Sequence, residues 1–458
     1  MVKVKDMTAG SVAPILIKFS IPLLISVVFQ QLYSISDSII AGQFIDKSAL
    51  AAIGASYPIT MIFLAFGTGM SSGCSVVIST FFGAKDIKNM KTAVSTTVIS
   101  TVILAAALTA AGFFASGLML RALGTDEAVM ADASSYLNIF TLGLVFLFLY
   151  NICTGIFSAL GDSSTPLYFL IGSSVGNILL DLLFVAVLKM GVPGTAWATF
   201  IAQGICSVLA FIVLYRRLKS IKCEKPDLFR FRMLSKIASL SIPGILQQSF
   251  VSVGNLFVQS LVNSCGLDVM AGYSSAIKLN VFAVTCFSAV CNSVSSFTAQ
   301  NVGARKYLRV KKGFAVGALM SAGMAALFSL VYLPFAGQLI YIFMDKNNVV
   351  NAGAAQAGAD FLHIVAPFYI TVALKITADG VLRGAGLVKQ FMFATFADLI
   401  LRVGFAFVLC PQFGARGIWM SWPVGWTTAM IMSLLFYFFY ARKITRKMSE
   451  TAAVDTNE

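Results

Sequence analysis

Long apolar stretches, each able to cross a lipid bilayer as a helix, dominate this 458-residue chain. A transmembrane α-helix needs about 20 predominantly apolar residues. Twelve such stretches lie near residues 14–40, 51–80, 92–119, 135–158, 166–188, 194–215, 237–262, 270–298, 313–340, 361–382, 391–410 and 416–440. Only 11% of the residues are charged, whereas a soluble domain carries about 25%. The sequence therefore predicts an all-α membrane protein with twelve transmembrane helices.

The basic residues are concentrated in alternate loops. The longest basic loop runs from Arg216 to Lys236, and most of the 33 lysines and arginines lie on the same side as this loop. Lys47 and Lys346 are among the few in the opposite loops. Because positive charge is retained on the cytoplasmic side, we expect a multi-pass protein of the plasma membrane with both termini in the cytoplasm. The net charge of +14 then reflects topology and contact with anionic lipid, not binding to nucleic acid.

The two halves of the chain resemble each other at an offset of about 220 residues. Ile21-Pro22 opens the first apolar stretch and Ile242-Pro243 the seventh, while Gly194 and Gly414 open the sixth and the twelfth. Each half has an even number of spans, so both halves enter the membrane from the same side, as in a parallel repeat. The sequence predicts two pseudo-symmetric six-helix bundles: an N-terminal lobe at 1–218, a basic cytoplasmic linker at 219–236, a C-terminal lobe at 237–447 and a disordered tail at 448–458.

Two carboxylates lie inside the apolar stretches of the N-terminal half, and no lysine or arginine lies beside them in these stretches to neutralise them. They are Asp37 and Asp181. A charged side chain in hydrocarbon costs about 2.5–3.5 kcal/mol on insertion scales, so a mobile cation is expected to neutralise them. Asn177 lies four residues before Asp181, on the same helix face, and Thr199 adds a hydroxyl from the next span. This oxygen set suits Na⁺, and two close carboxylates also suit a proton; a purely structural polar network is the alternative.

The C-terminal half carries its own basic partners. Lys375 precedes Asp379 by four residues, and Asp398 precedes Arg402 by four, so each pair can neutralise locally on one helix. Lys278 is left over and could pair with either acid. We expect a structural polar network here, with gating of the substrate as the alternative.

Motifs for catalysis are absent from the sequence. His363 is the only histidine, and the eight cysteines include no C-x-x-C. Gly172–Gly176 matches G-x-S-x-G, but a nucleophile elbow needs a strand-to-helix turn. No nucleotide-binding fingerprint occurs, so we expect neither an enzyme nor a bound cofactor. Candidate residues for a substrate cavity are Gln30, Tyr33, Gln247 and Asn255.

Three segments resemble the multidrug and toxic compound extrusion (MATE) family: Tyr33–Gly42 (YSISDSIIAG), Gly155–Pro166 (GIFSALGDSSTP) and Gly194–Thr199 (GTAWAT). The resemblance covers residues 10–445 and implies export driven by a Na⁺ or H⁺ gradient. In one branch, a span-one Asp, a span-five Asn-x-x-x-Asp and a span-six Thr form a cation site in the N-terminal lobe. Those positions match Asp37, Asn177, Asp181 and Thr199. Another branch relies on a Glu in span seven, which this chain lacks.

The sequence thus predicts a secondary active multidrug exporter that works by alternating access. It would expel small organic, often cationic, compounds against Na⁺ or H⁺, act as a monomer in the lipid bilayer and need no cofactor beyond the coupling ion. Its 39 phenylalanines, 13 tyrosines and 18 methionines suit apolar and cationic ligands. The alternative is a flippase for a lipid-linked precursor. A flippase cavity should be strongly basic, whereas the spans hold only Lys278, Lys375 and Arg402.

Overall fold

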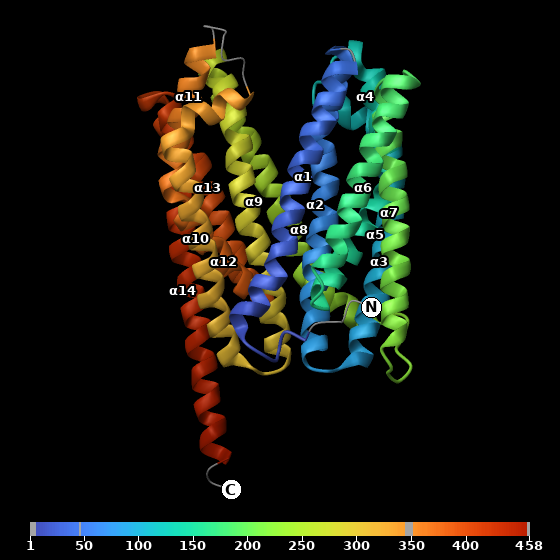
Figure 1. Ribbon diagram of the computed structural model, residues 1–458, viewed down its shortest axis with the longest axis vertical. Helices are drawn as coiled ribbons and strands as arrows, with labels where there is room; N and C mark the ends of the chain where they lie inside the picture. The colour runs from blue at the N-terminus through green and yellow to red at the C-terminus, as the bar shows by residue number, and fades with distance from the viewer. Residues whose placement is uncertain (1–5, 45–46, 344–350, 456–458) are drawn as a thin grey trace. The chain divides into compact units, whose positions relative to one another are not determined.

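The computed structural model describes residues 6–44, 47–343 and 351–455, without the side chains of residues 34–44, 47–50, 351 and 444–455. Within these ranges the chain is helical and contains no strand (Figure 1). The first half holds α1 (Val12–Phe44), α2 (Lys47–Gly83), α3 (Ile87–Ala122), α4 (Glu127–Leu142), α5 (Leu144–Ala159), α6 (Ser164–Asp181), a π-helical segment (Leu182–Val187) and α7 (Val192–Ser220). The second half holds α8 (Phe231–Ser264), α9 (Leu267–Gly303), α10 (Tyr307–Ile340), α11 (Asn351–Val365), α12 (Tyr369–Gly384), α13 (Val388–Phe413) and α14 (Ala415–Asp455), with 3₁₀ turns at Tyr341–Phe343 and Ala366–Phe368.

Each of the twelve predicted spans coincides with a helix or a broken helix. Within the described ranges, ten helices are long and apolar enough to cross a membrane by themselves, and α4 with α5 forms an eleventh span bent by 46°. The remaining predicted span is α8, which is 34 residues long and so extends about 51 Å at 1.5 Å per residue. Its composition is more polar, with Gln247, Gln248 and Asn255. The prediction of an all-α protein with twelve transmembrane helices is confirmed.

The chain divides into two compact units that do not follow the predicted lobe boundaries. The N-terminal unit comprises Met1–Asp6 and Ile21–Ser252, and the C-terminal unit comprises Met7–Ser20 and Val253–Glu458. Helices α1 and α8 therefore each begin in one unit and end in the other. The residues predicted as the linker, 219–236, pack within the N-terminal unit. The functional lobes at 1–218 and 237–447 stay a prediction.

Close helix packing in the N-terminal unit depends on glycine. A Cβ atom at Gly73 of α2 would lie 2.6 Å from the backbone nitrogen of Ser241 on α8, and one at Gly69 would lie 2.6 Å from that of Ile245. Glycine therefore lets the α2 backbone approach α8 directly, as small residues do in membrane helix pairs. Buried side chains such as Ile78, Ile152 and Phe157 fill the core beside this contact.

A buried carboxylate fixes the turn between α5 and α6. Asp162 accepts hydrogen bonds from the backbone nitrogen and the hydroxyl of Thr165, at 3.0 and 2.6 Å, and it pairs with the Arg217 guanidinium at the end of α7. Burial raises the pKa of the Asp162 carboxyl, but the hydrogen bonds from Thr165 and Arg217 outweigh it and hold the pKa below its usual value. This turn thus anchors α6, the helix that carries Asn177 and Asp181.

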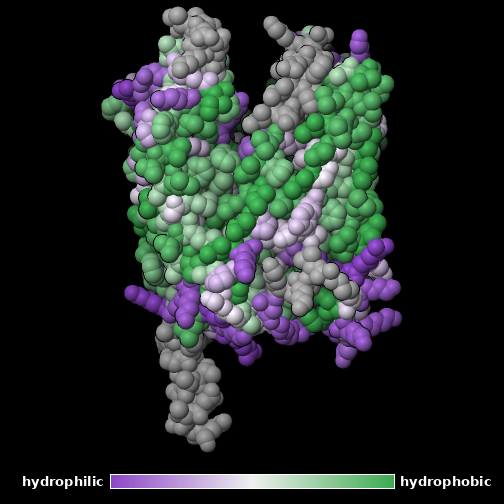
Figure 2. Space-filling view, viewed as in Figure 1, coloured by the Kyte–Doolittle hydropathy of each residue, from purple (hydrophilic) through white to green (hydrophobic). Residues whose placement is uncertain are grey.

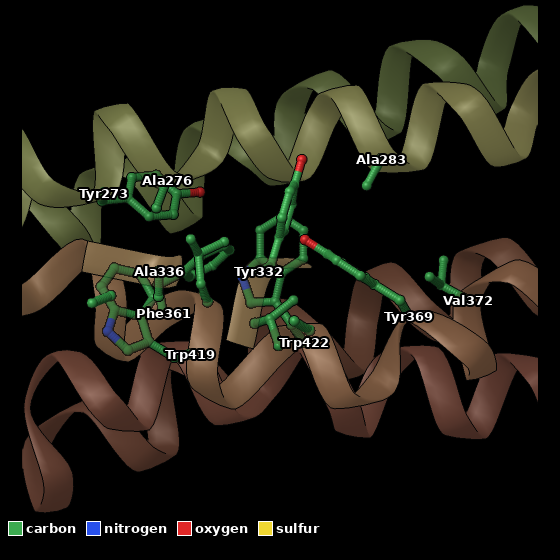
Figure 3. Close-up of a cluster of buried hydrophobic side chains, with 14 of the residues drawn as sticks. Tyr273, Ala276, Ala283, Tyr332, Ala336, Phe361, Tyr369, Val372, Trp419 and Trp422 are labelled. Atoms are coloured by element: carbon green, nitrogen blue, oxygen red, sulfur yellow. The ribbon is translucent and has the colours of Figure 1, made fainter. Parts of the chain in front are cut away.

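The C-terminal unit is built around aromatic side chains (Figure 3). Tyr273 of α9 stacks on Trp419 of α14, with ring centroids 5.0 Å apart. Phe361 of α11 presents its edge to Trp419 and to Trp422, at 5.1 and 5.6 Å. Stacked and edge-to-face pairs of this kind add about 0.5–1.5 kcal/mol beyond the area they bury, so this cluster ties α9, α11 and α14 together.

The last helix, α14, continues to Asp455, and residues 448–455 are part of it although the sequence predicted a disordered tail from 448. This stretch contains Met448, Glu450, Ala452 and Ala453, which favour helix, so the helix can extend beyond its apolar portion. Apolar residues cover the sides of the helices, and hydrophilic residues gather near their ends (Figure 2). Phe114 is 86% exposed and Leu319 75% exposed, as expected of side chains that face lipid.

Candidate functional site

Asn177 and Asp181 lie one turn apart near the end of α6 and are almost completely buried, with exposures of 3% and 1%. Asp181 is the last residue of α6, and the chain continues as a π-helical segment in which Leu188 donates to the carbonyl of Leu183 at 2.9 Å. Short π-helical turns are rare, and many of those known lie at functional sites. The wider turn directly after Asp181 is a local feature that the sequence did not reveal.

The Asn177 amide lies between three other polar side chains. One of its terminal atoms is 2.8 Å from Asp181 Oδ2 and 3.1 Å from the Tyr33 hydroxyl, and the other is 3.3 Å from Thr199 Oγ1 and 3.1 Å from the Thr199 backbone nitrogen. An ionised carboxylate only accepts hydrogen bonds. The amide nitrogen is therefore assigned to the side of Asp181 and Tyr33, and the amide oxygen accepts from Thr199.

The structure brings together three of the four residues predicted for the cation site: Asn177, Asp181 and Thr199. The fourth, Asp37, belongs to α1, but its side chain lies outside the described residues. Tyr33 was predicted to line a substrate cavity, and here its hydroxyl contacts Asn177. Tyr33 lies one turn before Asp37 on α1, so the four-residue spacing was the signal that could have linked it to this cluster.

The polar groups of this cluster are mostly oxygen atoms. They comprise the Asp181 carboxylate and the Tyr33 and Thr199 hydroxyls, with the Asn177 amide oxygen turned toward Thr199; cations such as Na⁺ prefer oxygen ligands, by the logic that holds for Ca²⁺ and Mg²⁺. A buried carboxylate can also hold a proton. Within the described residues there is no group of three His, Cys, Asp or Glu side chains that could bind a transition metal. The chemistry of these residues is compatible with Na⁺ or H⁺.

In the C-terminal unit, one of the two predicted ion pairs forms. Lys375 Nζ is 2.8 Å from Asp379 Oδ2 on α12. Lys375 also donates to Thr395 at 3.2 Å, and Ser433 donates to Asp379 at 2.6 Å. Both charged side chains are buried, so the pair and its two hydroxyl partners satisfy each other inside the helix bundle. Whether this pair has a role beyond structure stays a prediction.

The prediction for Asp398 and Arg402 was wrong. Both side chains are described, and no ion pair or hydrogen bond joins them. The Arg402 guanidinium lies instead over the Trp422 ring, 4.5 Å from its centroid. A Cβ atom at Gly425 would lie 2.5 Å from Asp398 Oδ1, so Asp398 packs directly against α14. The cation–π contact replaces the pairing that the four-residue spacing suggested.

The remaining candidate residues lie apart from these clusters. Lys278 was predicted to pair with Asp379 or Asp398, but in the described part of the chain its amine lies over the Phe343 ring at 5.3 Å and forms no ion pair. The substrate-cavity residues Gln30 and Asn255 are exposed and Gln247 is half-buried, and their role stays a prediction.

Ten or eleven membrane-spanning helices among the described residues, with buried polar and charged groups inside them, define a polytopic membrane protein. The sequence profile of the family described as MatE matches residues 22–183 and 243–408. The chain belongs to the MatE family. It is therefore a membrane transporter and not an enzyme.

The chain is similar over almost its whole length to curated relatives. It is 28% identical over 449 residues to the "Probable multidrug resistance protein YpnP" of Bacillus subtilis (strain 168), covering 98% of this chain and 100% of the relative. It is 23% identical over 444 residues to the "Multidrug export protein MepA" of Staphylococcus aureus (strain MSSA476), covering 94% and 95%. A solved structure described as the outward-facing conformation of a multidrug resistance MATE family transporter superposes with a TM-score of 0.89 at 22% identity, covering 97% and 99%. At this identity, the structural likeness supports the fold.

Proposed function

We propose that this transporter is a secondary active multidrug exporter, which expels amphipathic, often cationic, organic compounds in exchange for Na⁺ or H⁺. The names of its relatives, a multidrug resistance protein and a multidrug export protein, support the substrate class. We further propose that it acts as a monomer in the plasma membrane with both termini in the cytoplasm, which the distribution of basic loops supports.

The observation that carries the coupling proposal is the buried cluster of Asp181, Asn177, Thr199 and Tyr33. Asp181 is 1% exposed inside a membrane-spanning helix. An ionised carboxylate buried inside a membrane-spanning helix costs free energy, and such residues usually serve ion or proton transport. Asp37 is proposed as a second carboxylate of this site, on the strength of its place one turn after Tyr33 on α1.

The Asn177 amide holds the site in one arrangement. With its nitrogen toward Asp181 it donates to the carboxylate, which suits an ionised acid without a bound cation, and its oxygen accepts from the hydroxyl and the backbone nitrogen of Thr199. A cation that binds Asp181 would compete with the amide nitrogen for the carboxylate. Binding of the coupling ion is therefore expected to weaken this hydrogen bond.

The coupling ion can drive export only if it binds one conformation of the transporter more tightly than the other. Tyr33 belongs to α1, while Asn177 and Asp181 belong to α6 and Thr199 to α7. A cation that draws these three helices together would favour one arrangement of α1, and its release would favour another. Substrate binding would then be linked to the charge state of Asp181.

Transport by purified protein in liposomes tests this function. We expect ethidium to be exported when either a Na⁺ gradient or a pH gradient is imposed alone, and the effective gradient identifies the coupling ion. Liposomes without protein are the control for leakage. Ethidium movement that ignores both gradients would contradict antiport. Movement of a lipid-linked oligosaccharide without any dye transport would instead favour a flippase.

A further inference from the structure

The residues before α1 are held tightly against the C-terminal unit. Arg309, near the start of α10, donates to the backbone carbonyls of Gly10, Met7 and Ala9 at 2.7, 3.1 and 3.4 Å. Lys306 donates to the carbonyl of Thr8 at 2.9 Å. Two fully buried amides at the end of α9 complete the contact. The Met7 backbone nitrogen donates to Gln300 at 3.0 Å, and Asn301 donates to the Met7 carbonyl at 3.3 Å. We call this contact the α1 clamp.

Arg309 is itself held in position. Its Nε donates to Asn301 Oδ1 at 3.0 Å, and its guanidinium lies over the Phe297 ring at 5.7 Å. Charge-assisted hydrogen bonds of this kind are roughly twice as strong as neutral ones. Side chains of α9 and α10 thus hold the main chain of residues 7–10 in position through its carbonyl groups. Met7 is 1% exposed and Thr8 4% exposed, so this part of the N-terminal segment is a packed part of the C-terminal unit.

The residues before α8 are held in the same way by the N-terminal unit. Thr92 and Thr96 of α3 accept hydrogen bonds from the backbone nitrogens of Asp227 and Arg230, at 3.1 and 3.3 Å. Ser95 donates to the Asp227 carbonyl at 3.1 Å, and Lys91 donates to the Ile221 carbonyl at 2.6 Å. We call this contact the α8 clamp.

The two clamps are related by the internal repeat, although their side chains differ. In each case the third long helix of one repeat holds the segment that precedes the first helix of the other repeat. Helix α10 holds the residues before α1, and α3 holds the residues before α8. In each case the first helix then leaves the unit that holds its start: Ile21 of α1 begins the part in the N-terminal unit, and Val253 of α8 begins the part in the C-terminal unit.

We propose that Arg309 and Lys306 are positioning residues for ion coupling. By holding the start of α1 on the C-terminal unit, they let α1 carry a displacement from the cation site to that unit. The proposal rests on the proposed cation site, because Tyr33 of α1 contacts Asn177 there. A helix can transmit movement along its axis only if its far end is held; an unheld end would slide and the displacement would be lost. On this proposal the clamp stays closed throughout the transport cycle.

The variant Arg309→Gln with Lys306→Gln tests this role. The matched control is Lys312→Gln with Lys389→Gln, which removes two exposed positive charges from the same unit. Coupling is measured as the ratio of the ethidium Kd values without and with the coupling ion (Na⁺ at fixed pH, or a pH step at fixed Na⁺). Allosteric couplings are typically 5–150-fold. We expect a ratio in that range for the wild type and the control, and within about twofold of one for the unclamped variant.

A separate measurement shows whether the cation site itself survives. Binding of an ion to the folded state raises Tm, so the ion should still raise the Tm of the unclamped variant. If the ion changes neither Tm nor ethidium affinity in the wild type, the proposed cation site fails, whatever the clamp does. If the unclamped variant keeps the wild-type coupling ratio and gradient-driven efflux, the clamp proposal fails and the cation site is unaffected.

A covalent replacement of the clamp distinguishes loss of the clamp from general misfolding of the variant. Thr8→Cys with Lys306→Cys can be joined by a short bifunctional thiol reagent, in a Cys223→Ser background that removes the exposed native cysteine. With Arg309→Gln also present, we expect weak coupling before the reagent is added and restored coupling and efflux afterwards. Transport that stops when the bridge forms would show that the clamp must open during the cycle, which would overturn the proposal.

Discussion

Replacing Lys375 with methionine should destabilise the C-terminal unit strongly. Lys375 and Asp379 are 6% and 2% exposed, and their charged atoms are 2.8 Å apart. The substitution leaves the Asp379 carboxylate buried with Ser433 as a hydrogen-bond donor but without its cation. Removing one partner of a buried pair costs about 3–5 kcal/mol. With about 2–4 °C of Tm lost per kcal/mol in a unit of this size, the apparent Tm should fall by roughly 6–20 °C.

Two further variants separate the pair from the charges alone. Lys375→Met with Asp379→Leu removes both charges, and such replacements are often neutral or stabilising, so most of the lost stability should return. Asp398→Asn should lower stability less than Lys375→Met does, because Lys375 keeps its paired carboxylate Asp379 and loses only the more distant attraction of Asp398.

The assay is thermal unfolding in detergent at one fixed heating rate, because membrane proteins often unfold irreversibly and only rates are then comparable. Lys389→Met, which removes an exposed lysine at the start of α13, is the control. If Lys375→Met unfolds at the same temperature as this control, the buried pair does not stabilise the unit. The reasoning also fails if the double variant is as unstable as the single one.

Three further outcomes are expected. Thr199→Ala should weaken gradient-driven efflux in liposomes without abolishing it, because the hydroxyl is one oxygen among several in the cluster; complete loss would assign it a larger role. The folded pKa of Asp162 lies below its unfolded value of about 3.9, so the stability that this carboxylate contributes is present above pH 3.9 and is lost as the pH falls through the folded pKa. Acidification from pH 5 to pH 3 should therefore lower the Tm of the wild type more than that of Asp162→Asn. An equal fall of Tm in both proteins would refute this. Gly73→Ala should cost about 1–3 kcal/mol because its Cβ would overlap α8, whereas Gly54→Ala, which has nothing within 4 Å, should be neutral in the same unfolding assay.

Much of the fold could be predicted because the membrane restricts the chain to helices of known length. The apolar stretch at 237–262 predicted α8, although this helix is more polar than the other spans. The division into units could not be predicted. Whether residues 7–20 and 231–252 pack with one half of the chain or the other depends on tertiary contacts such as Arg309 with the Gly10 carbonyl, which leave no periodic signal in the sequence.

The candidate site was predictable where residues lie on one helix face and unpredictable where helices meet. The four-residue spacing of Asn177 and Asp181 correctly placed them together. The same spacing predicted an ion pair between Asp398 and Arg402 that does not form. The long Arg402 side chain instead contacts a residue on another helix, Trp422 of α14. The role of Asp37 stays a prediction, because its side chain lies outside the described residues.

Gradient-driven efflux by the Asp181→Asn protein tests the central claim most directly. Ethidium binding and gradient-driven ethidium export are measured in parallel at matched protein levels, with Asp132→Asn, an exposed carboxylate of the same unit, as the control. We predict that Asp181→Asn binds ethidium as the wild type does but exports none under either gradient, while Asp132→Asn does both. Normal gradient-driven export by the Asp181→Asn protein would contradict the proposed cation site.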